Sequence, residues 1–522
     1  MSAATPPLGS NVVCSSHHLA SAAGQELFRQ GGNAVDAALA AAMALTIVEP
    51  MACGIGGDAF AIISAGGRLH GLNGSGRSPR AWSRDYFTER HDGRIPKHGW
   101  DAVTVPGVVG AWQAMSARFG RLPLQKIAEP AMRLATEGFE VGPLLAQMFE
   151  RTAKAVADQP GFQQAFCPQG RPPAAGERFT LPGAADTLRS IAMSEGRDFY
   201  EGDLAQRMLQ HAATHGAALN AQDLAEYAPE WLDPISLSYK DHEVYELPPN
   251  GQGVAALAAL GMLEHFDLAA LDPAEATHLQ IEAMKLAFAD LYHYVGDPAH
   301  MACGSRELLR PAYLEARARG IDAKRTQHAT VGSPHQGDTV YVAAADADGN
   351  MVSFIQSTYT PFGSGVVIPG TGICMQNRGW GFSMAPGHPN VVAGGKRPFH
   401  TIIPGFVRAR GRDLMAFGLV GADMQPQGHV QLIHHMLNDG MDPQQACNQP
   451  RWRILPSGEI SVERGMSETV LEGLAARGHK LVRSDDFLLG FGAAQVVRRE
   501  GDGYRGGTDP RREGRVAVST GV

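Results

Sequence analysis

The run Thr339-Val340-Tyr341-Val342-Ala343-Ala344-Ala345 is followed, after five residues, by Met351-Val352-Ser353-Phe354-Ile355-Gln356-Ser357. The residues between them, Asp346-Ala347-Asp348-Gly349-Asn350, contain an Asp-Gly turn signal. Two β-prone runs around such a turn predict a β-hairpin. Both faces of the first strand are fairly apolar, so we expect the hairpin to lie inside a layered structure.

The rest of the chain predicts helices packed on antiparallel sheets, an α+β fold. The period is mainly helical between about residues 106 and 295, and a polar stretch at 321–338 is the best candidate for an exposed linker. We expect helices at 37–48 (N-capped by Asn33), 107–119, 124–137, 203–214, 274–294, 426–437 and 468–475. We expect strands at 59–63, 69–72, 402–407, 414–419, 459–462 and 494–498.

Composition excludes several classes of protein. The 522 residues are 44% apolar and 19% charged, so the chain can build a large core. The formal net charge is −8 and there is no long basic run, which argues against nucleic acid as a partner. We see no signal peptide and no apolar stretch of the roughly 20 residues that a bilayer requires, so we expect no membrane contact. Six scattered cysteines favour free thiols and a cytoplasmic location.

Familiar catalytic and metal-binding signatures are missing. The sequence has no G-x-S-x-G elbow, no Walker loop, no G-x-G-x-x-G and no H-E-x-x-H. The pairs His17-His18 and His434-His435 are adjacent, and adjacent side chains on a helix or strand diverge. We therefore interpret them as ordinary surface or helix histidines and predict no metal site.

Gly337-Asp338-Thr339 stands where the polar stretch meets the hairpin. If the bond before Thr339 is broken, this residue carries a hydroxyl and a free α-amine, a nucleophile and its own general base. An α-amine titrates near pH 8, so part of it is unprotonated at neutral pH. From chemistry alone, a threonine that merely begins a strand is the favoured interpretation, because threonine is common in strands.

A set of motifs spread over nearly the whole chain favours the catalytic interpretation of Thr339 instead. Together they resemble the γ-glutamyltranspeptidase family of N-terminal nucleophile hydrolases. The motifs are Gly31-Gly32-Asn33-Ala34-Val35-Asp36-Ala37-Ala38, Glu49-Pro50, Gly54-Ile55-Gly56-Gly57, Arg77, Gly337-Asp338-Thr339, Asp348-Gly349-Asn350, Phe362-Gly363-Ser364-Gly365, Lys396-Arg397-Pro398 and Gly507-Thr508-Asp509-Pro510-Arg511.

The resemblance implies a proenzyme with an αββα four-layer sandwich of the N-terminal nucleophile hydrolase type. It implies self-cleavage between Asp338 and Thr339, which gives a large subunit (1–338) and a small subunit (339–522) of 184 residues (522 − 338). The large subunit is expected to be mostly helical, and both subunits form one intertwined fold. A dimer of such heterodimers is compatible with this scheme, and no metal or organic cofactor is required.

The resemblance also implies roles for individual residues. Thr339 is the nucleophile, and Ser357 matches a second hydroxyl residue that contacts it. Gly421 and Ala422 match a glycine pair whose amides form the oxyanion hole; alanine retains the amide donor. Arg77 matches an arginine that clamps the substrate's α-carboxylate, a task that suits a guanidinium. The alternative for Arg77 is a structural arginine that braces the glycine turn.

Other positions depart from the family pattern. Where γ-glutamyl enzymes hold the donor's α-ammonium with an acidic residue, this chain has Gly381. The neighbouring Arg378 would repel an ammonium group, and Tyr359 replaces a usual asparagine. His400 and Thr401 replace a pair of serines. A γ-glutamyl donor would leave its cation unpaired in a closed site, so glutathione is a poor fit.

These departures favour an amide whose acid portion bears a carboxylate but no amine. Gly57-Asp58, Leu72-Asn73-Gly74-Ser75-Gly76-Arg77 and Met424-Gln425-Pro426-Gln427-Gly428-His429 resemble the branch that hydrolyses oxamate to oxalate and ammonia in purine catabolism. Tyr359 and His400 could supply further donors to that small anion. A glutaryl-amide acylase and a γ-glutamyltransferase or glutathione hydrolase remain open, as does an unprocessed scaffold that binds a small acid.

Overall fold

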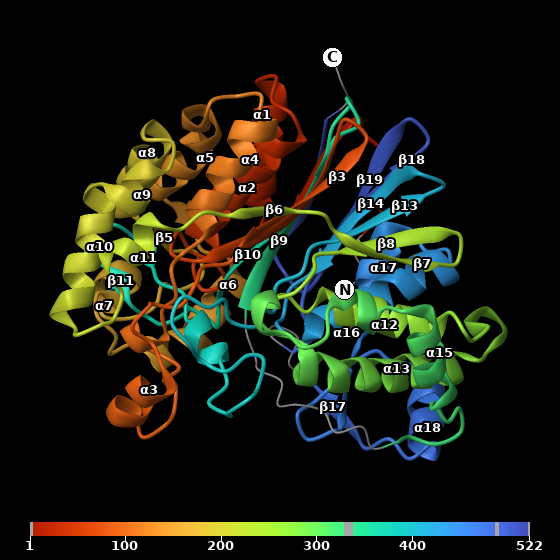
Figure 1. Ribbon diagram of the computed structural model, residues 1–522. Coiled ribbons are helices and arrows are strands. Elements are labelled where there is room, and N and C mark those ends of the chain that lie inside the picture. Colours follow the sequence, from red (N-terminus) through yellow and green to blue (C-terminus); the bar gives the residue numbers. More distant parts are fainter. Residues whose placement is uncertain (1–3, 328–337, 486–489, 520–522) are drawn as a thin grey trace.

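Two stacked antiparallel sheets form the centre of the protein, and helices cover both outer faces (Figure 1). The computed structural model describes residues 4–327, 338–485 and 490–519. Helices from the first half of the chain, in warm colours, lie on one side of the sheets, and green and blue helices lie on the other. The predicted α+β class is confirmed.

The first sheet has seven strands in the order β20-β1-β9-β10-β2-β3-β6. The predicted hairpin is confirmed as β9 and β10 at its centre. The bounds are β1 Asn11–Ser15, β2 Asp58–Ala65, β3 Arg68–Gly74, β6 Glu230–Leu232, β9 Asp338–Ala345, β10 Met351–Tyr359 and β20 Arg515–Ser519.

The second sheet has six strands in the order β19-β18-β14-β13-β8-β7. Its bounds are β7 Ile235–Tyr239, β8 His242–Glu246, β13 Gly405–Ala409, β14 Arg412–Leu419, β18 Ala494–Glu500 and β19 Gly503–Thr508. The strand expected at 402–407 was placed too early. The Ile403 N–H donates to the Gln425 side chain rather than to a neighbouring strand, so the ladder starts only at Gly405.

Small sheets lie outside the two main ones. They are β4–β5 (Phe139–Glu140, Arg178–Phe179), β11–β12 (Val367–Ile368, Ile373–Cys374) and β15-β16-β17 (Trp452–Ile454, Ile460–Glu463, Leu481–Ser484). The strand expected at 459–462 is β16.

The helices in the first half of the chain are α1 His18–Arg29, α2 Ala34–Val48, α3 Arg84–His91, α4 Val108–Phe119, α5 Leu124–Glu137, α6 Pro143–Ala153, α7 Phe162–Phe166, α8 Pro182–Met193, α9 Arg197–Glu201, α10 Asp203–Thr214 and α11 Ala221–Ala225. The later helices are α12 Gly253–Leu263, α13 Pro273–Tyr294, α14 Ser305–Leu308, α15 Pro311–Arg319, α16 Met424–Ile433, α17 Pro443–Asn448 and α18 Glu468–Ala476. Within the part of the chain that the structure describes, every helix is too short or too polar to span a bilayer.

Helix α2 shows how local sequence sets an element. The Asn33 side chain accepts from the N–H groups of Val35 and Asp36, and the Asp36 carboxylate accepts from the Asn33 N–H. This capping box satisfies donors that the first turn would otherwise leave free. All fifteen residues of the helix are buried. The predicted cap is confirmed, and the helix starts three residues earlier than expected.

Strand β9 shows the layering residue by residue. Val340, Val342 and Ala344 pack in the core between the first sheet and helices such as α2. The alternate residues, among them Tyr341, pack in the core between the two sheets. Gly418 of β14 lies against the Tyr341 ring, where a Cβ atom would be only 2.3 Å away. With a third core under α12 and α13, the predicted four-layer αββα sandwich is confirmed.

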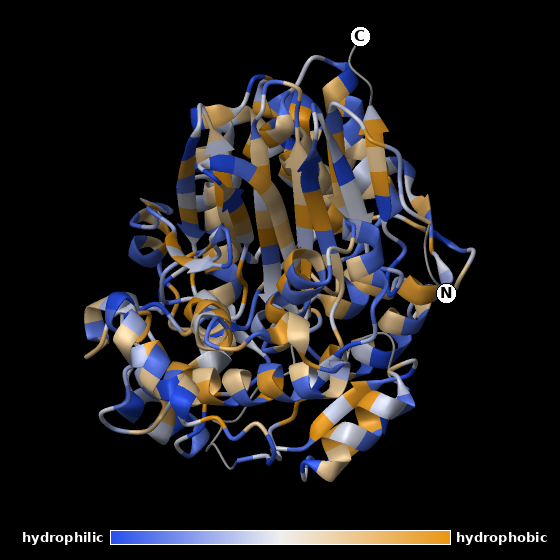
Figure 2. Ribbon diagram, turned by 90° about the vertical axis from the view of Figure 1, so that its right-hand side faces the viewer, coloured by the Kyte–Doolittle hydropathy of each residue, from blue (hydrophilic) through white to orange (hydrophobic). Residues whose placement is uncertain are grey.

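Two further expectations, the helix at 426–437 and the linker at 321–338, differ in part from the structure. The helix expected at 426–437 is α16 followed by a π-helical turn, His434–Asn438. Of the expected linker, residues 322–327 are mostly exposed, and 328–337, which include Gly337, lie outside the described residues. Figure 2 shows hydrophobic positions recurring along the central strands, in contrast to the polar segments at the surface.

Candidate active site

The hydroxyl groups of Thr339 and Ser357 meet inside the first sheet. Thr339 is the second residue of β9 and is 2% exposed. Its Oγ1 donates to Ser357 Oγ at 3.2 Å, and that oxygen also accepts from the Tyr359 N–H at 2.8 Å. The β9–β10 register is irregular between Gln356 and Tyr359, which lets two side chains of β10 crowd one position of β9. The structure thus brings the two expected hydroxyl residues together.

Tyr359 and Arg378 form the next part of the site. Tyr359 pairs with Asp338 across the ladder and has a positive φ of 84°. The Arg378 guanidinium lies 4.3 Å from the centre of the Tyr359 ring, and its Nη1 donates to Thr401 Oγ1 at 2.7 Å. Arg378 is fully buried, yet its Nε and Nη2 have no hydrogen-bond partner among the described residues.

Burial lowers the pKa of Arg378 to about 10, so the guanidinium stays charged at neutral pH. Such a cation, with unused donors, is suited to hold an anion. Gly381 follows on the same short turn, and a Cβ atom there would lie 3.9 Å from the Tyr359 hydroxyl. The position that the family resemblance assigns to an ammonium-binding acid is therefore beside Tyr359, and here it carries no side chain.

His400 and Asp58 form a buried pair that the sequence did not predict. Asp58 lies opposite Ser357 in the sheet, and its Oδ2 is 3.1 Å from His400 Nε2. His400 Nδ1 accepts from the Ile402 N–H at 3.4 Å, so in the neutral ring Nε2 carries the proton and donates to Asp58. Burial raises the pKa of Asp58 to about 7 and, with Arg378 nearby, lowers the pKa of His400.

Gly421 and Ala422 form a turn directly after β14. Their φ angles are 116° and 51°, so both residues are in the positive-φ region. Neither N–H donates a described hydrogen bond, which leaves both amides available. Gln252 Nε2 donates to the carbonyls of Ala422 (2.7 Å) and Thr401 (2.5 Å) and so ties this turn to the segment that binds Arg378.

Asp423 is the next residue and was also missed by the sequence analysis. It is 2% exposed, and among the described residues neither carboxylate oxygen has a hydrogen-bond partner of good geometry. The nearest cation is Arg453, whose Nη2 lies 3.5 Å from Oδ2. Burial raises the pKa of Asp423 to about 6, although Arg453 opposes this.

Arg77 lies in the segment that follows β3. Its guanidinium is half-exposed and donates to Gly395 O (3.1 Å) and Asp297 (3.3 Å). It lines a cavity of about 660 Å³ together with Arg397 and Tyr227. Among the described contacts none joins Arg77 to Thr339; the link runs through the adjacent Gly76, whose N–H donates to Asp58. The clamp role of Arg77 stays a prediction.

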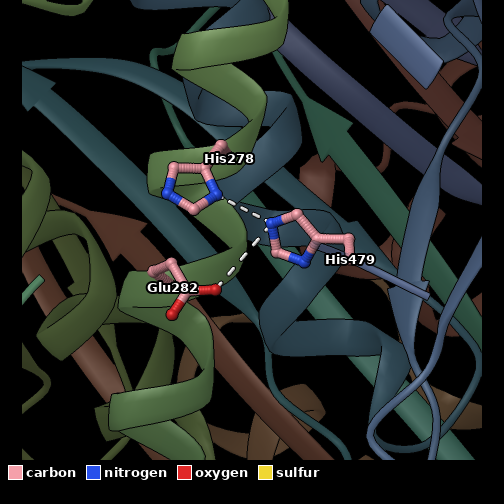
Figure 3. A group of neighbouring side chains, drawn as sticks. All are labelled: His278, Glu282 and His479. Carbon is pink, nitrogen blue, oxygen red and sulfur yellow. Dashed lines mark hydrogen bonds and ion pairs between the residues drawn. The ribbon is translucent and has the colours of Figure 1, made fainter. Parts of the chain in front are cut away.

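The side chains that come nearest to a metal-binding arrangement lie elsewhere. His278 and Glu282 of α13 face His479, and their ligand atoms lie within 4.8 Å of one another (Figure 3). His278 Nδ1 is 2.7 Å from His479 Nε2. Lys285 Nζ, however, donates to Glu282 at 2.7 Å and already supplies the positive charge that this carboxylate requires.

The remaining bonds of this cluster hold the segment before residue 328. Glu282 also accepts from the Thr326 hydroxyl and the Gln327 N–H, and His278 Nε2 donates to the Asp322 carbonyl. The cluster is therefore explained as a hydrogen-bonded clasp between α13, this segment and His479.

The chain matches the family model described as Gamma-glutamyltranspeptidase over residues 20–519. It belongs to the γ-glutamyltranspeptidase family. It is 38% identical to the glutathione hydrolase-like YwrD proenzyme of Bacillus subtilis over 96% of this chain and 97% of that one. It is 34% identical to the oxamate amidohydrolase proenzyme of Klebsiella pneumoniae, with the same coverage.

The structural comparison gives the same result. The crystal structure of a cephalosporin acylase from Bacillus halodurans superposes with a TM-score of 0.96 and 42% identity, and the match covers 100% of this chain and 98% of the acylase. The family resemblance read from the motifs is confirmed, and so is the N-terminal nucleophile hydrolase fold.

Proposed function

We propose that this member of the family is a self-processing amidohydrolase with an N-terminal threonine. In the first reaction Thr339 Oγ attacks the Asp338 carbonyl, the peptide C–N bond breaks, and the α-amine of Thr339 takes up the proton. Water then hydrolyses the resulting ester. The products are residues 1–338 and 339–522, in line with relatives that carry the word proenzyme in their names.

The same hydroxyl then acts on a substrate amide. The α-amine accepts the Thr339 proton as Oγ attacks the amide carbon, and the amides of Gly421 and Ala422 bind the oxyanion. The proton passes to the leaving nitrogen, ammonia or an amine departs, and water releases the acid from the acyl-enzyme. Ser357 holds the nucleophile through the 3.2 Å hydrogen bond.

The observation that carries the choice of substrate is the buried Arg378 with two unused donors. A carboxylate on the acyl part of the substrate can satisfy both, and charge-assisted hydrogen bonds of this kind are the strong ones. Thr401 and Tyr359 position the guanidinium, and His400 lies beside them. We favour oxamate, a minimal amide with an adjacent carboxylate; Arg77, which lines the cavity of about 660 Å³, is proposed as a further contact for the carboxylate.

A second candidate is a γ-glutamyl hydrolase, favoured by the name of the Bacillus subtilis relative. A third is a glutaryl-amide acylase, favoured by the likeness to cephalosporin acylase. Both candidates use the same nucleophile, Thr339. They differ only in the groups that the acyl part of the substrate carries beside its carboxylate.

A substrate panel separates these candidates. We expect ammonia release from oxamate, and a higher kcat/KM for glutaryl p-nitroanilide than for γ-glutamyl p-nitroanilide. The Thr339→Ala protein is the matched control and should release neither product. A clear preference for the γ-glutamyl compound, with no ammonia from oxamate, would overturn the choice of substrate and leave the nucleophile standing.

A further inference from the structure

Asp423 is a buried carboxylate for which neither the fold nor the proposed chemistry so far has a use. We propose that Asp423 is a specificity-determining residue that accepts a hydrogen bond from an N–H group of the substrate. The site would then bind a dipolar molecule, with its carboxylate at Arg378 and its nitrogen at Asp423. This inference rests on the proposed function and identifies a second group of the substrate that the site recognises, an N–H donor.

The first support is the state of the carboxylate. Neither oxygen has a hydrogen-bond partner of good geometry among the described residues, a condition that proteins rarely tolerate unless a ligand or water completes it. Arg453 balances the charge, but its Nη2 approaches Oδ2 only to 3.5 Å, and its Nη1 is held by the Gly490 carbonyl at 3.1 Å. At 3.5 Å this contact is at most a weak hydrogen bond, so the carboxylate oxygens retain acceptor capacity.

The second support is position. Asp423 follows Gly421 and Ala422, the amides proposed to bind the oxyanion, so its backbone lies next to the reacting end of the site. The charged and titratable groups coupled to it are Arg453, Tyr359 and Tyr292; burial raises the pKa of both tyrosines, and the Asp423 charge adds to this effect. Tyr359 also stacks on Arg378. The Tyr359 ring therefore contacts Arg378 and is electrostatically coupled to Asp423.

The chemistry required at Asp423 is an N–H donor, and a substrate can offer it from two sources. One is the nitrogen of the scissile amide, which becomes the leaving amine or ammonia. The other is an α-ammonium group on the acyl part, as in γ-glutamyl compounds. A carboxylate accepts from either, and kinetics distinguish them.

The test compares three substrates in processed wild-type and Asp423→Ala enzyme: glutaryl p-nitroanilide, γ-glutamyl p-nitroanilide and mono-p-nitrophenyl glutarate, an ester with no N–H. If the scissile nitrogen is recognised, kcat/KM for both anilides falls at least tenfold more than for the ester. If the α-ammonium is recognised, only the γ-glutamyl compound falls in this way. An equal loss on all three overturns the proposal.

Arg453→Gln is the matched control, because it removes the cation and keeps the carboxylate. It should lower activity on all three substrates by a similar factor. If Asp423 served only to neutralise Arg453, the two variants would give the same pattern, and the proposal would fail. Asp423→Asn repeats the test if the alanine variant does not fold.

A binding measurement separates this proposal from the proposed function. Calorimetry compares glutaramate and γ-methyl glutamate with monomethyl glutarate; the first adds an amide N–H, and the second adds an α-ammonium group. Wild type should prefer one of the two over monomethyl glutarate by at least tenfold, and Asp423→Ala should lose that preference even if no substrate of the panel is turned over. No preference for either compound in the wild type contradicts the role of Asp423, whatever the outcome for hydrolysis.

Discussion

Two buried polar clusters of this protein differ in how they are satisfied. In the clasp formed by His278, Glu282, Lys285 and His479, no buried side-chain nitrogen or oxygen lacks a hydrogen-bond partner. In the candidate site, in contrast, Arg378 and Asp423 each have two buried polar atoms without a hydrogen-bond partner among the described residues. Both clusters contain charges and histidines.

The difference teaches where to look for a binding site. A buried charge without partners costs free energy, so a folded protein keeps one where a ligand completes it. Three side chains of the clasp lie as close together as metal ligands do (Figure 3), yet their hydrogen bonds go to one another, to Lys285 and to the segment before residue 328. Unused hydrogen-bonding capacity, rather than the kinds of residue, distinguishes the site from the structural cluster.

Opening the closed cluster should have the largest effect. Glu282→Gln leaves the buried Lys285 ammonium without its counter-charge, so we expect a loss of about 3–5 kcal/mol in the free energy of unfolding. Chemical denaturation measures this loss. The ratio of kcat/KM for glutaryl and γ-glutamyl p-nitroanilide should not change in the variant; a changed ratio would mean that the clasp belongs to the site.

Changing Arg378 should, in contrast, alter the substrate preference. Arg378→Gln removes the proposed contact with the substrate carboxylate, and we expect kcat/KM for anionic amides to fall by roughly 10²-fold, about 3 kcal/mol. A neutral amide such as butyryl p-nitroanilide should lose much less. Arg77→Gln, at the other proposed carboxylate contact, should raise KM for the same anionic amides with a smaller loss of kcat/KM. Equal losses on neutral and anionic amides would remove the anion-binding role.

Gly381→Asp should add a binding group to the site, a carboxylate that can hold an ammonium group of the substrate. The new carboxylate would lie beside Tyr359, where a Cβ atom meets nothing nearer than 3.5 Å, so the backbone should accept it. We expect the preference for γ-glutamyl over glutaryl p-nitroanilide to rise by at least tenfold, since roughly 1.5–3 kcal/mol is typical of a hydrogen bond to a charged group. Gly381→Ser is the uncharged control. An unchanged ratio would show that this position does not meet the substrate.

The smallest expected effect is a pH dependence. Burial raises the pKa of Asp423 to about 6, so the carboxylate is ionised above that pH and becomes neutral below it. The ratio of kcat/KM for glutaryl p-nitroanilide to that for the ester should therefore decrease below about pH 6. The ratio cancels the titration of the Thr339 α-amine. Asp423→Asn should flatten this profile, and a profile that persists in the variant belongs to another group, such as Asp58.

Local patterns predicted much of the fold. The Asp-Gly turn located the hairpin of β9 and β10, and Asn33 located the start of α2 to within a few residues. The strand at β13 was placed too early because Ile402 and Ile403 are apolar but turn away from the ladder. Hydrophobicity alone does not distinguish a buried loop from a strand.

The site was only partly predictable. Thr339 and Ser357 could be found because motif matches fix their spacing on one hairpin. Asp58 and Asp423 were missed since their burial and the presence or lack of partners are decided only when distant segments meet: His400, a partner of Asp58, lies 342 residues from it. For Asp423 the sequence carried a weak signal, an acidic residue next to the Gly421-Ala422 turn.

The intact mass of the purified protein under denaturing conditions tests the central claim most directly. The account predicts two species that meet at Asp338 and Thr339, and a single 55.6 kDa chain for Thr339→Ala. Two species would establish the self-cleavage and the N-terminal threonine together. A single wild-type chain that stays uncut after long incubation would contradict the mechanism and favour an unprocessed scaffold that binds a small acid.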